Sequence, residues 1–386
     1  MSNSAPWIVH KFGGSSVADA ACFERVAAIL DASPGERLGV VLSACKGVTD
    51  GLLGLVRLAE MQDESYRAEI AALRARHAAI AEALLPVEVM RLYMAGFDRD
   101  CRDLEGILHT VKLTRSAAPN VRDLIAGYGE IWSTKLFHRY LETRPQRRGP
   151  VQWIDARRVV VVEWGPLGPA VQWEPSRAQL TDLVDADFKG TLVITGFIAA
   201  DRRGVQTTLG RNGSDFSASI FGALLAAAEI HIWTDVDGVL SADPRRVPDA
   251  TVIDSLSYSE AMELAYFGAK VIHPQTMAPA VGDAIPIWIR NTFAPQKPGT
   301  LICAEPKSLL PVKGIASIDQ VALVNLEGAG MIGVPGTAHR LFGALREEGI
   351  SVIVISQGSS EHSICCAVPR SEGERAGAVV RRAFER

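Results

Sequence analysis

Short apolar runs rich in Val, Ile and Leu alternate with longer segments of helical periodicity over residues 1–303. A strand that is covered on both faces needs no polar alternation, so these runs predict buried strands. We place them at 7–12, 37–43, 151–154, 159–162, 191–197, 229–234 and 286–291. Strands that alternate with helices predict an α/β fold with a mostly parallel central sheet.

The segments between these runs predict the helices that cover the sheet. Ala, Leu, Arg and Glu at helical spacing over 51–141 predict a layer of helices with one break, at 117–120. Ser15 or Ser16 can cap the helix that follows the first strand and starts near Val17. We place this helix at 18–32 and the other helices at 218–228 and 257–267. Gly and Pro residues predict a connection at 164–174 and a boundary loop at 292–300.

The pattern changes from residue 314 onward. It predicts a strand, a helix, two strands and a helix, at 321–327, 337–348, 351–357, 362–368 and 371–384. This order lacks only a closing strand to be a ferredoxin-like βαββαβ unit. We therefore expect a first domain over 1–303, a linker over 304–313 and a second, smaller domain over 314–386.

The second domain also contains a G-x-G-x-x-G match, at Gly328 to Gly333. A dinucleotide-binding unit needs an acidic residue at the end of its second strand, but Ser356-Gln357 stands there. Val334-Pro335 also interrupts the helix that should follow the glycines. We do not expect this segment to bind NAD.

Composition excludes several classes of partner. The 386 residues are 48% hydrophobic, enough for two or three domain cores, and a formal charge of −4 gives no general attraction to nucleic acid or anionic membranes. The six cysteines show neither C-x-x-C pairs nor metal-ligand spacing, which indicates a reducing compartment. With no leader pattern and no membrane-spanning run, we expect a cytoplasmic protein.

The first candidate site follows the opening strand, at Lys11-Phe-Gly-Gly-Ser-Ser. Gly13 and Gly14 let backbone amides approach an anion, Ser15 adds a hydroxyl, and Lys11 adds a positive charge. The alternative, an ordinary strand, turn and capped helix, remains open on this stretch alone. The Walker pattern is absent here, because the lysine precedes the glycines.

A denser polar cluster lies at 209–217, where Arg211 and Asp215 frame a second glycine-rich turn before a helix. It predicts another anion site with its own cation and carboxylate. Polar residues also follow the strand at 37–43, and Glu130 lies beside two glycines at a helix start. Asp235, Asp237 and Asp243 lack the spacing and the closing Glu of a calcium loop, so no metal site is predicted.

These turns resemble the aspartate kinases of the amino acid kinase family. The matching segments are KFGGSSV at 11–17, VLSACKGVTD at 41–50, GE at 129–130, LGRNGSDFSA at 209–218, WTDVDGV at 233–239, DPR at 243–245 and YFGAKVIHP at 266–274. They keep their order over roughly 300 residues. The tail is similar to the family's ACT regulatory modules, which bind end-product amino acids and pair subunits.

The resemblance implies an αβα sandwich and transfer of the γ-phosphoryl group of MgATP to the side-chain carboxylate of L-aspartate. The product would be 4-phospho-L-aspartate, in the first step toward lysine, threonine and methionine. Mg²⁺ would enter as MgATP, and lysine or threonine could act as an effector. A homodimer is also expected.

The family's site residues carry over position by position. By family position, Lys11 and Asp215 would be catalytic, with Asp215 organising the lysine. The residues expected to bind aspartate are Thr49, Glu130, Arg211 and Ser214, with Arg211 for a carboxylate and Glu130 for the ammonium group. Those expected to bind nucleotide are Lys11, Gly13, Gly14, Ser15, Thr234, Asp235, Arg245 and Lys270. Regulatory contacts are expected at Gly330 and Gln357.

Three positions depart from the family pattern. Ser15 replaces a frequent threonine but keeps the hydroxyl, and Leu240 stands where a tyrosine often lies beside the nucleotide. The tail holds one incomplete ACT module where relatives usually carry two. Its open sheet edge implies that a partner subunit covers it, or that the chain is a fragment of a bifunctional protein fused to homoserine dehydrogenase or diaminopimelate decarboxylase.

Two alternatives stay open. The first is another amino acid kinase, acting on glutamate, acetylglutamate, carbamate or a nucleotide. The second is a regulatory amino-acid sensor that keeps an inactive kinase domain. The presence of Lys11, Glu130, Arg211 and Asp215 argues against the sensor.

Overall fold

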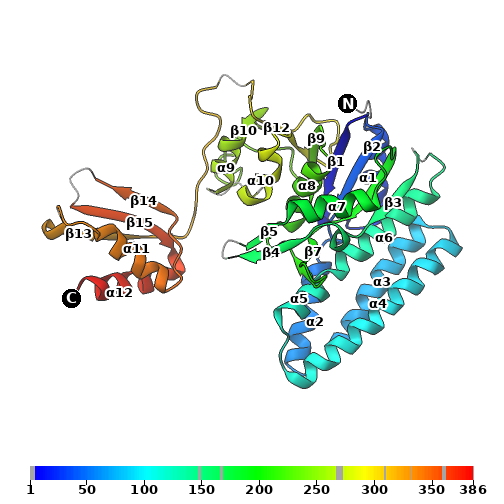
Figure 1. Ribbon diagram of the computed structural model, residues 1–386, viewed down its shortest axis with the longest axis horizontal. Coiled ribbons are helices and arrows are strands. Elements are labelled where there is room, and N and C mark those ends of the chain that lie inside the picture. Colours follow the sequence, from blue (N-terminus) through cyan, green and yellow to red (C-terminus); the bar gives the residue numbers. More distant parts are fainter. Residues whose placement is uncertain are drawn as a thin grey trace. The chain divides into compact units, whose positions relative to one another are not determined.

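The computed structural model describes residues 5–146, 149–165, 168–266, 273–307, 310–331, 333–358 and 362–385. The chain divides into two compact units, Met1–Ala316 and Ser317–Arg386. The first unit contains the large sheet and most of the helices, and the second contains a small sheet with two helices (Figure 1).

The first unit is built on an eight-stranded sheet in the order β10-β12-β11-β9-β1-β2-β6-β3. These strands are β1 (Trp7–Phe12), β2 (Arg37–Leu42), β3 (Val151–Ile154), β6 (Gly190–Thr195), β9 (Glu229–Thr234), β10 (Ser255–Ser257), β11 (Ile287–Asn291) and β12 (Thr300–Cys303). Neighbours pair in parallel except β11 and β12, so the predicted mostly parallel sheet is confirmed. β1 lies between β2 and β9 because every residue from 7 to 12 is buried and needs neighbours on both edges.

Three of the strand and loop predictions are wrong. The strand expected at 159–162 is largely absent, because β4 (Val162–Gly165) begins only at its end and pairs with β5 (Gly168–Val171) as a hairpin. That hairpin also replaces much of the connection expected over 164–174. β11 is not the last strand of the sheet, since β12 follows the loop at 292–299 and pairs with both β10 and β11.

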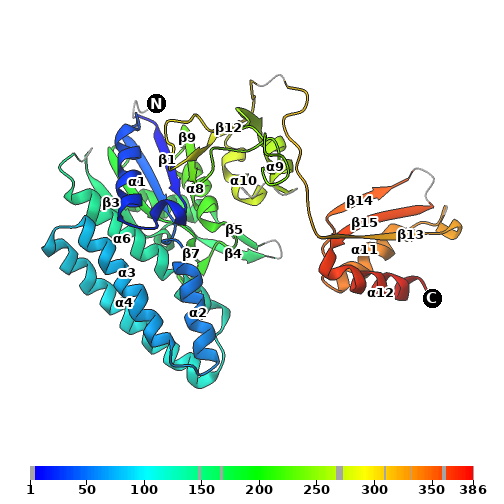
Figure 2. The same cartoon turned by 180° about the vertical axis from the view of Figure 1, so that it is seen from behind.

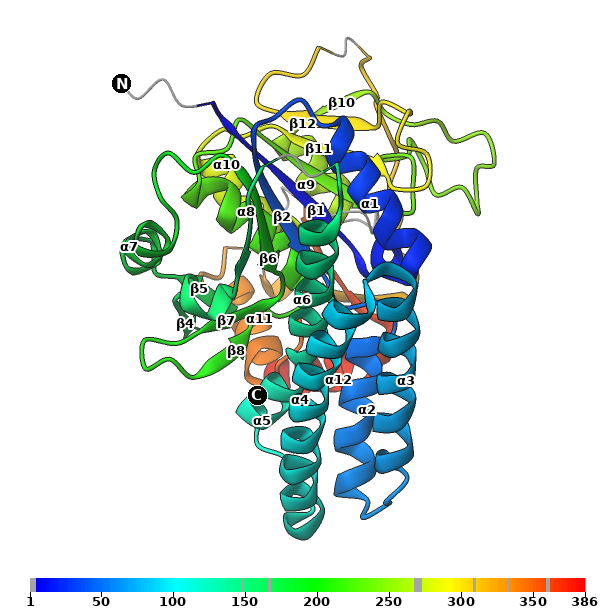
Figure 3. The same cartoon turned by 90° about the vertical axis from the view of Figure 1, so that its right-hand side faces the viewer.

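The helical layer lies on one face of the sheet and has more breaks than predicted. It contains α1 (Ala20–Ala32), α2 (Val48–Glu60), α3 (Tyr66–Leu84), α4 (Val87–Thr114), α5 (Pro119–Ala126) and α6 (Tyr128–Thr143). Further breaks at 61–65 and 85–86 coincide with the positive φ of Gln62 and with Pro86. Figure 3 shows α2, α3, α4 and α6 side by side, and their apolar faces form one core against β1 and β2.

The helices α7 (Trp173–Leu183), α8 (Gly213–Leu224) and α10 (Pro274–Gly282) contribute to a second core. Val9, Ile232 and Ile289 supply the sheet side of this core, from β1, β9 and β11. α8 begins at Gly213, five residues before the predicted start, because Asn212 in the left-handed region ends the preceding turn. α9 (Tyr258–Tyr266) matches most of the helix predicted at 257–267.

The start of α1 also differs from the prediction. Asp19 caps this helix, since its carboxylate accepts a hydrogen bond from the Cys22 amide at 2.9 Å. Ser15 and Ser16 lie instead in a short 3₁₀ turn, Gly14–Val17. The two serines are therefore held at the carboxyl end of β1.

The second unit has the predicted βαββα order. It contains β13 (Val321–Glu327), α11 (Thr337–Glu347), β14 (Val354–Gln357), β15 (Ser363–Pro369) and α12 (Gly373–Phe384). The strands form an antiparallel sheet in the order β13-β15-β14, and α11 and α12 share a core with one face of it (Figure 2). Among the described residues, the outer edges of β13 and β14 have no strand beside them.

Across the part of the chain that the structure describes, no helix is long and apolar enough to span a membrane.

Candidate active site

The predicted site residues gather at the carboxyl ends of the parallel strands. Lys11, near the end of β1, pairs in register with Val41 of β2 and Ile232 of β9. The turns that leave β1, β2 and β9 therefore begin at the same edge of the sheet. β2 and β9 lie on opposite sides of β1 in this sheet. The carboxyl end of such a central strand is the usual ligand site of open α/β sheets.

Lys11 and Asp215 form a buried ion pair at this edge. Their Nζ and Oδ1 atoms are 2.6 Å apart, and the two side chains are only 9% and 12% exposed. Asp215 lies in the first turn of α8, where the helix dipole favours a negative charge. The pair holds the Lys11 ammonium group beside Gly13. A Cβ at position 13 would lie 3.4 Å from Lys11 Nζ.

The glycine turn after β1 is tied to both neighbouring strand ends. The Gly13 amide, which we expected to face an anion, donates to the Trp233 carbonyl at 3.3 Å. A Cβ on Gly14 would stand 3.0 Å from the Ala44 carbonyl oxygen, so this position tolerates little beyond glycine. The Ser16 hydroxyl bonds to Thr292 at 2.6 Å. Gly13 thus contributes space around Lys11, while its amide is already bonded.

A cavity of about 360 Å³ opens beside this turn. It brings together five residues named from the sequence, from four separate segments: Gly14, Thr49, Glu130, Arg211 and Ser214. Its other lining residues are Ser43, Ala44, Cys45, Lys46, Gly47, Asp50, Phe197, Gly210, Asn212 and Gly213. Lys11 and Asp215 do not line the cavity themselves, but each lies next to a lining segment: Asp215 follows Ser214 directly, and Lys11 Nζ lies beside Gly13, which precedes Gly14.

Glu130 is the buried acid of this cavity. It is 3% exposed, and its Oε1 accepts a hydrogen bond from the Ala44 amide at 3.2 Å. Among the described residues, its Oε2 has no hydrogen-bond partner. Burial raises the pKa of Glu130 to about 8, because desolvation disfavours the charged form more than the Ala44 amide favours it. An unpartnered, buried carboxylate oxygen is suited to a cationic group of a ligand.

Close contact between α6 and the β2 turn places Glu130. A Cβ on Gly129 would come within 2.6 Å of the Ala44 Cβ, so glycine lets the helix approach the turn. The Ser133 hydroxyl, one turn further along α6, donates to the Ser43 carbonyl at 2.7 Å.

Sequence reasoning did not name Ser43, Phe197 or Asn212 as site residues. The Ser43 hydroxyl donates to the Ser214 hydroxyl at 2.9 Å. This bond joins the carboxyl end of β2 to the second glycine-rich turn, at 209–217. A signal for Ser43 was present, since a hydroxyl residue that ends a buried parallel strand lies at the ligand edge. Asn212 adopts a positive φ of 56°, which Asn accepts more readily than most residues, whereas the φ of 67° at Phe197 has no comparable sequence signal.

Of the other residues expected to bind nucleotide, Thr234 and Asp235 lie at the end of β9, and Arg245 lies in the loop between β9 and β10. Thr234 closes β9, and its hydroxyl donates to the exposed Asp235 carboxylate at 3.3 Å. Arg245 forms an exposed ion pair with Asp243 at 2.6 Å. Thr234, Asp235 and Arg245 do not line the 360 Å³ cavity. Lys270 lies outside the described residues.

The two expected regulatory residues lie in the second unit. Gly330 belongs to a short 3₁₀ turn, Ala329–Met331, and Gln357 is the last residue of β14. Both are exposed.

No cluster of three or more His, Cys, Asp or Glu side chains suited to a metal ion occurs within the described ranges. Magnesium that enters with a nucleotide needs no such cluster, because phosphate oxygens and waters supply most of its ligands.

Comparison with known proteins gives matches over nearly the whole chain. The model of the amino acid kinase family matches residues 6–291, and an ACT domain model matches residues 324–384. The bifunctional aspartokinase/homoserine dehydrogenase 1 of Zea mays, a chloroplastic protein, is 42% identical over 95% of this chain and 40% of its own length. The chain thus spans about two fifths of such bifunctional relatives.

Shorter relatives are covered more fully. The lysine-sensitive aspartokinase 3 of Escherichia coli is 35% identical over 92% of this chain and 77% of its own length. A crystal structure of E. coli aspartokinase III in complex with lysine and aspartate is 30% identical, with a TM-score of 0.74. That match covers 95% of this chain and 79% of the solved one.

Proposed function

The chain belongs to the amino acid kinase family, and we propose that it acts as an aspartate kinase. It transfers the γ-phosphoryl group of MgATP to the side-chain carboxylate of L-aspartate and produces 4-phospho-L-aspartate, which commits carbon to lysine, threonine and methionine. The observation that carries this proposal is the joining of the Lys11–Asp215 pair to a cavity that contains a buried acid, Glu130, and a cation, Arg211.

Recognition of aspartate requires opposite charges at its two ends. Glu130 accepts the ammonium group, and the guanidinium of Arg211 binds a carboxylate with two parallel hydrogen bonds. Thr49 and Ser214 add hydroxyls to the same cavity. The bound substrate then presents its side-chain carboxylate toward Lys11.

Phosphoryl transfer needs alignment and neutralisation of charge more than covalent help. Lys11 supplies the positive charge, Asp215 holds it in place, and the turn at Gly13, Gly14 and Ser15 leaves room for phosphate oxygens. No general base is required, because the acceptor carboxylate is already ionised near neutral pH. Mg²⁺ accompanies ATP and neutralises its phosphates.

Thr234 and Asp235, at the end of β9, would bind the nucleoside. By family position, Arg245 and Lys270 would bind its phosphates. Feedback by lysine or threonine is assigned to the second unit, at Gly330 and Gln357. The protein functions as a homodimer in the cytoplasm, where its six unpaired cysteines stay reduced.

The decisive experiment is an acyl phosphate assay. Purified protein is incubated with MgATP and L-aspartate, and the product is trapped with hydroxylamine, with and without lysine or threonine. We expect hydroxamate that requires aspartate and does not form with glutamate. Hydroxamate from glutamate alone would replace aspartate kinase with another amino acid kinase, and no product from a folded, ATP-binding protein would favour the sensor.

A further inference from the structure

A polar contact outside the cavity joins helix α5 to the hairpin formed by β7 (Ile198–Ala200) and β8 (Gln206–Thr208). The Asp123 carboxylate of α5 accepts hydrogen bonds from the hydroxyls of Thr207 and Thr208, at 3.1 Å and 3.2 Å. It also accepts the Thr208 amide at 3.4 Å. One side chain of α5 therefore holds the end of β8 through three donors.

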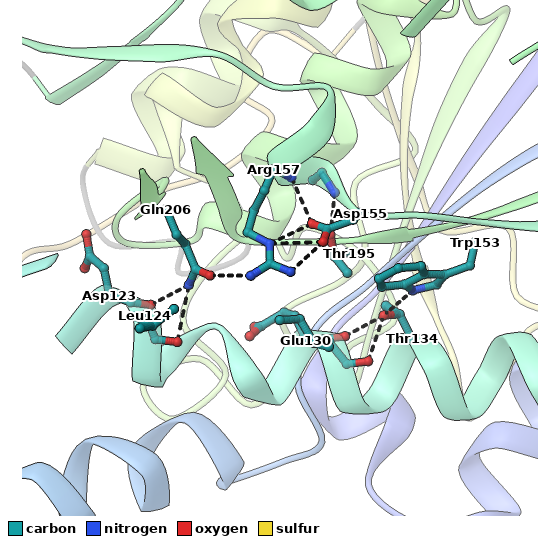
Figure 4. A network of polar contacts seen from close by, with 11 residues as sticks. Asp123, Leu124, Glu130, Thr134, Trp153, Asp155, Arg157, Thr195 and Gln206 are labelled. Carbon is teal, nitrogen blue, oxygen red and sulfur yellow. Dashed lines mark hydrogen bonds and ion pairs between the residues drawn. The ribbon is translucent and has the colours of Figure 1, made fainter. Parts of the chain in front are cut away.

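Gln206 holds the same two elements from the hairpin side. Its Nε2 donates to the carbonyls of Asp123 and Leu124 at 2.8 Å and 3.3 Å, and its Oε1 accepts from Arg157 at 2.8 Å (Figure 4). Arg157 is fixed in turn by Asp155, which follows β3. A Cβ on Gly127 would come within 2.3 Å of Gln206 Nε2, so the contact leaves no spare room.

This α5–β8 contact lies between the two groups that must recognise the ends of one amino acid. α6 starts at Tyr128, directly after α5, and carries Glu130 in its first turn. β8 ends at Thr208 and leads within a few residues to Arg211 and Ser214. The contact thus joins the segment that holds the ammonium acceptor to the segment that holds the carboxylate-binding cation.

We propose that Asp123 is a positioning residue that fixes the separation between Glu130 and Arg211, and so the length of amino acid that the cavity accepts. This inference rests on the proposed aspartate kinase function. Neither Asp123 nor Gln206 lines the cavity, so the effect acts through the two segments. Most of the residues expected to bind nucleotide follow β1 and β9, and these two strands take no part in the α5–β8 contact.

The test uses Asp123→Ala, which removes the acceptor, and Thr208→Val, which removes one donor and keeps the shape. We expect Asp123→Ala to raise the KM for aspartate about tenfold, since small misplacements of binding groups have effects of this size or larger. The KM for ATP should change less than about twofold, and the preference for aspartate over glutamate in kcat/KM should fall. Thr208→Val should change the KM for aspartate and the preference for aspartate in the same directions, but by less. Asp123→Asn keeps one acceptor oxygen, so its KM for aspartate should lie close to that of the wild type.

The matched control is Asp201→Ala, at the exposed tip of the same hairpin. Asp201 accepts the amides of Arg203 and Val205 but has no contact with α5 among the hydrogen bonds of the described residues. Its loss loosens the turn, and we expect an unchanged aspartate KM. Thermal unfolding of each variant accompanies the kinetics.

The outcomes separate the two proposals. Wild-type protein that forms no aspartyl hydroxamate overturns the function and the inference together. Active wild type with an unchanged aspartate KM in Asp123→Ala overturns the inference alone. Equal rises in the KM for aspartate and for ATP, or a fall only in kcat that tracks lost thermal stability, assign Asp123 a purely structural role and also overturn it.

Discussion

At the scale of single residues, the proposed role of Glu130 makes aspartate binding depend on pH, because this side chain is buried. Its pKa of about 8 means that the carboxyl group of the ligand-free protein is largely protonated below that pH. In the unfolded chain the same group ionises near its ordinary value of 4.5. The folded protein therefore loses stability as the pH rises between these two values, because the unfolded state releases its proton first.

The same shift predicts a pH-dependent kcat/KM for aspartate. Binding of an ammonium group requires the ionised carboxylate, so kcat/KM should rise with pH, by up to about tenfold per unit, and level off above about 8. Initial rates from pH 6 to 9 at low aspartate measure this rise. In Glu130→Gln the rise should disappear and kcat/KM should stay low, and a wild-type profile that is flat over this range would contradict the role of Glu130.

A second prediction concerns the buried ion pair. Lys11→Ala should lower kcat about a thousandfold, because a positive charge at the transferred group is lost from a dry site. It also leaves Asp215 as an unpaired buried carboxylate, which is destabilising. The double variant Lys11→Ala/Asp215→Asn removes that charge, so it should recover thermal stability without recovering activity. Activity retained in Lys11→Ala would refute the assignment.

At the scale of elements, α6 can approach the turn after β2 because residue 129 is a glycine. Gly129→Ala should destabilise the protein by about 1–3 kcal/mol, since the new methyl group meets Ala44 at 2.6 Å. It should also raise the KM for aspartate, because α6 carries Glu130. Gly106→Ala on α4 is the control: its Cβ meets nothing within 4 Å, and the change should stabilise the helix by about 0.5–1 kcal/mol.

Denaturant unfolding compares the two glycine variants. A Gly129→Ala protein as stable as wild type, with an unchanged aspartate KM, would show that α6 can move away from the turn at no cost.

Sequence patterns predicted the elements that are buried on both sides better than the others. β1, β2, β6 and β9 are short runs rich in β-branched and other apolar residues, and each was placed within about two residues of its observed ends. The β4–β5 hairpin was predicted as a loop because its glycines and prolines dominate the local pattern. The helix break at 61–65 was missed because the composition barely changes there, whereas the break at 85–86 had a signal in Pro86 that the prediction did not use.

The candidate site was predictable in part. Charged and glycine-rich motifs indicated Lys11, Asp215 and Arg211, and the structure brings Lys11 and Asp215 into contact. The pKa shift of Glu130 depends on side chains far away in the sequence that exclude water from it, and no local pattern records that. The bond from the Gly13 amide to Trp233 likewise depends on β9 lying beside β1.

At the scale of the whole molecule, two family models match the two parts of the chain, at residues 6–291 and 324–384. The resemblance drawn from the ordered motifs is thereby confirmed. Among its described residues, the second unit presents a short apolar row on one sheet face: Leu323 and Val354 lie in register on either side of the buried Ala367 and are 71% and 44% exposed. Exposed apolar rows of this kind favour association.

This row gives the prediction for assembly. We expect a dimer in sedimentation velocity at micromolar concentration, and Leu323→Lys should shift it toward monomer by placing charge in the interface. Leu92→Lys is the control, because Leu92 is equally exposed, at 73%, but lies on α4 of the first unit. A wild-type protein that sediments as a monomer would contradict the expected homodimer.

The place of β1 in the sheet has a consequence for synthesis on the ribosome. β1 ends at residue 12, and β9, which covers its second edge, begins at residue 229. At translation rates of about 5–20 residues per second, this edge waits about 10–40 s for its partner. An apolar strand with an open edge is a template for wrong pairing during that time, so this nascent chain depends on early shielding by its helices or by chaperones.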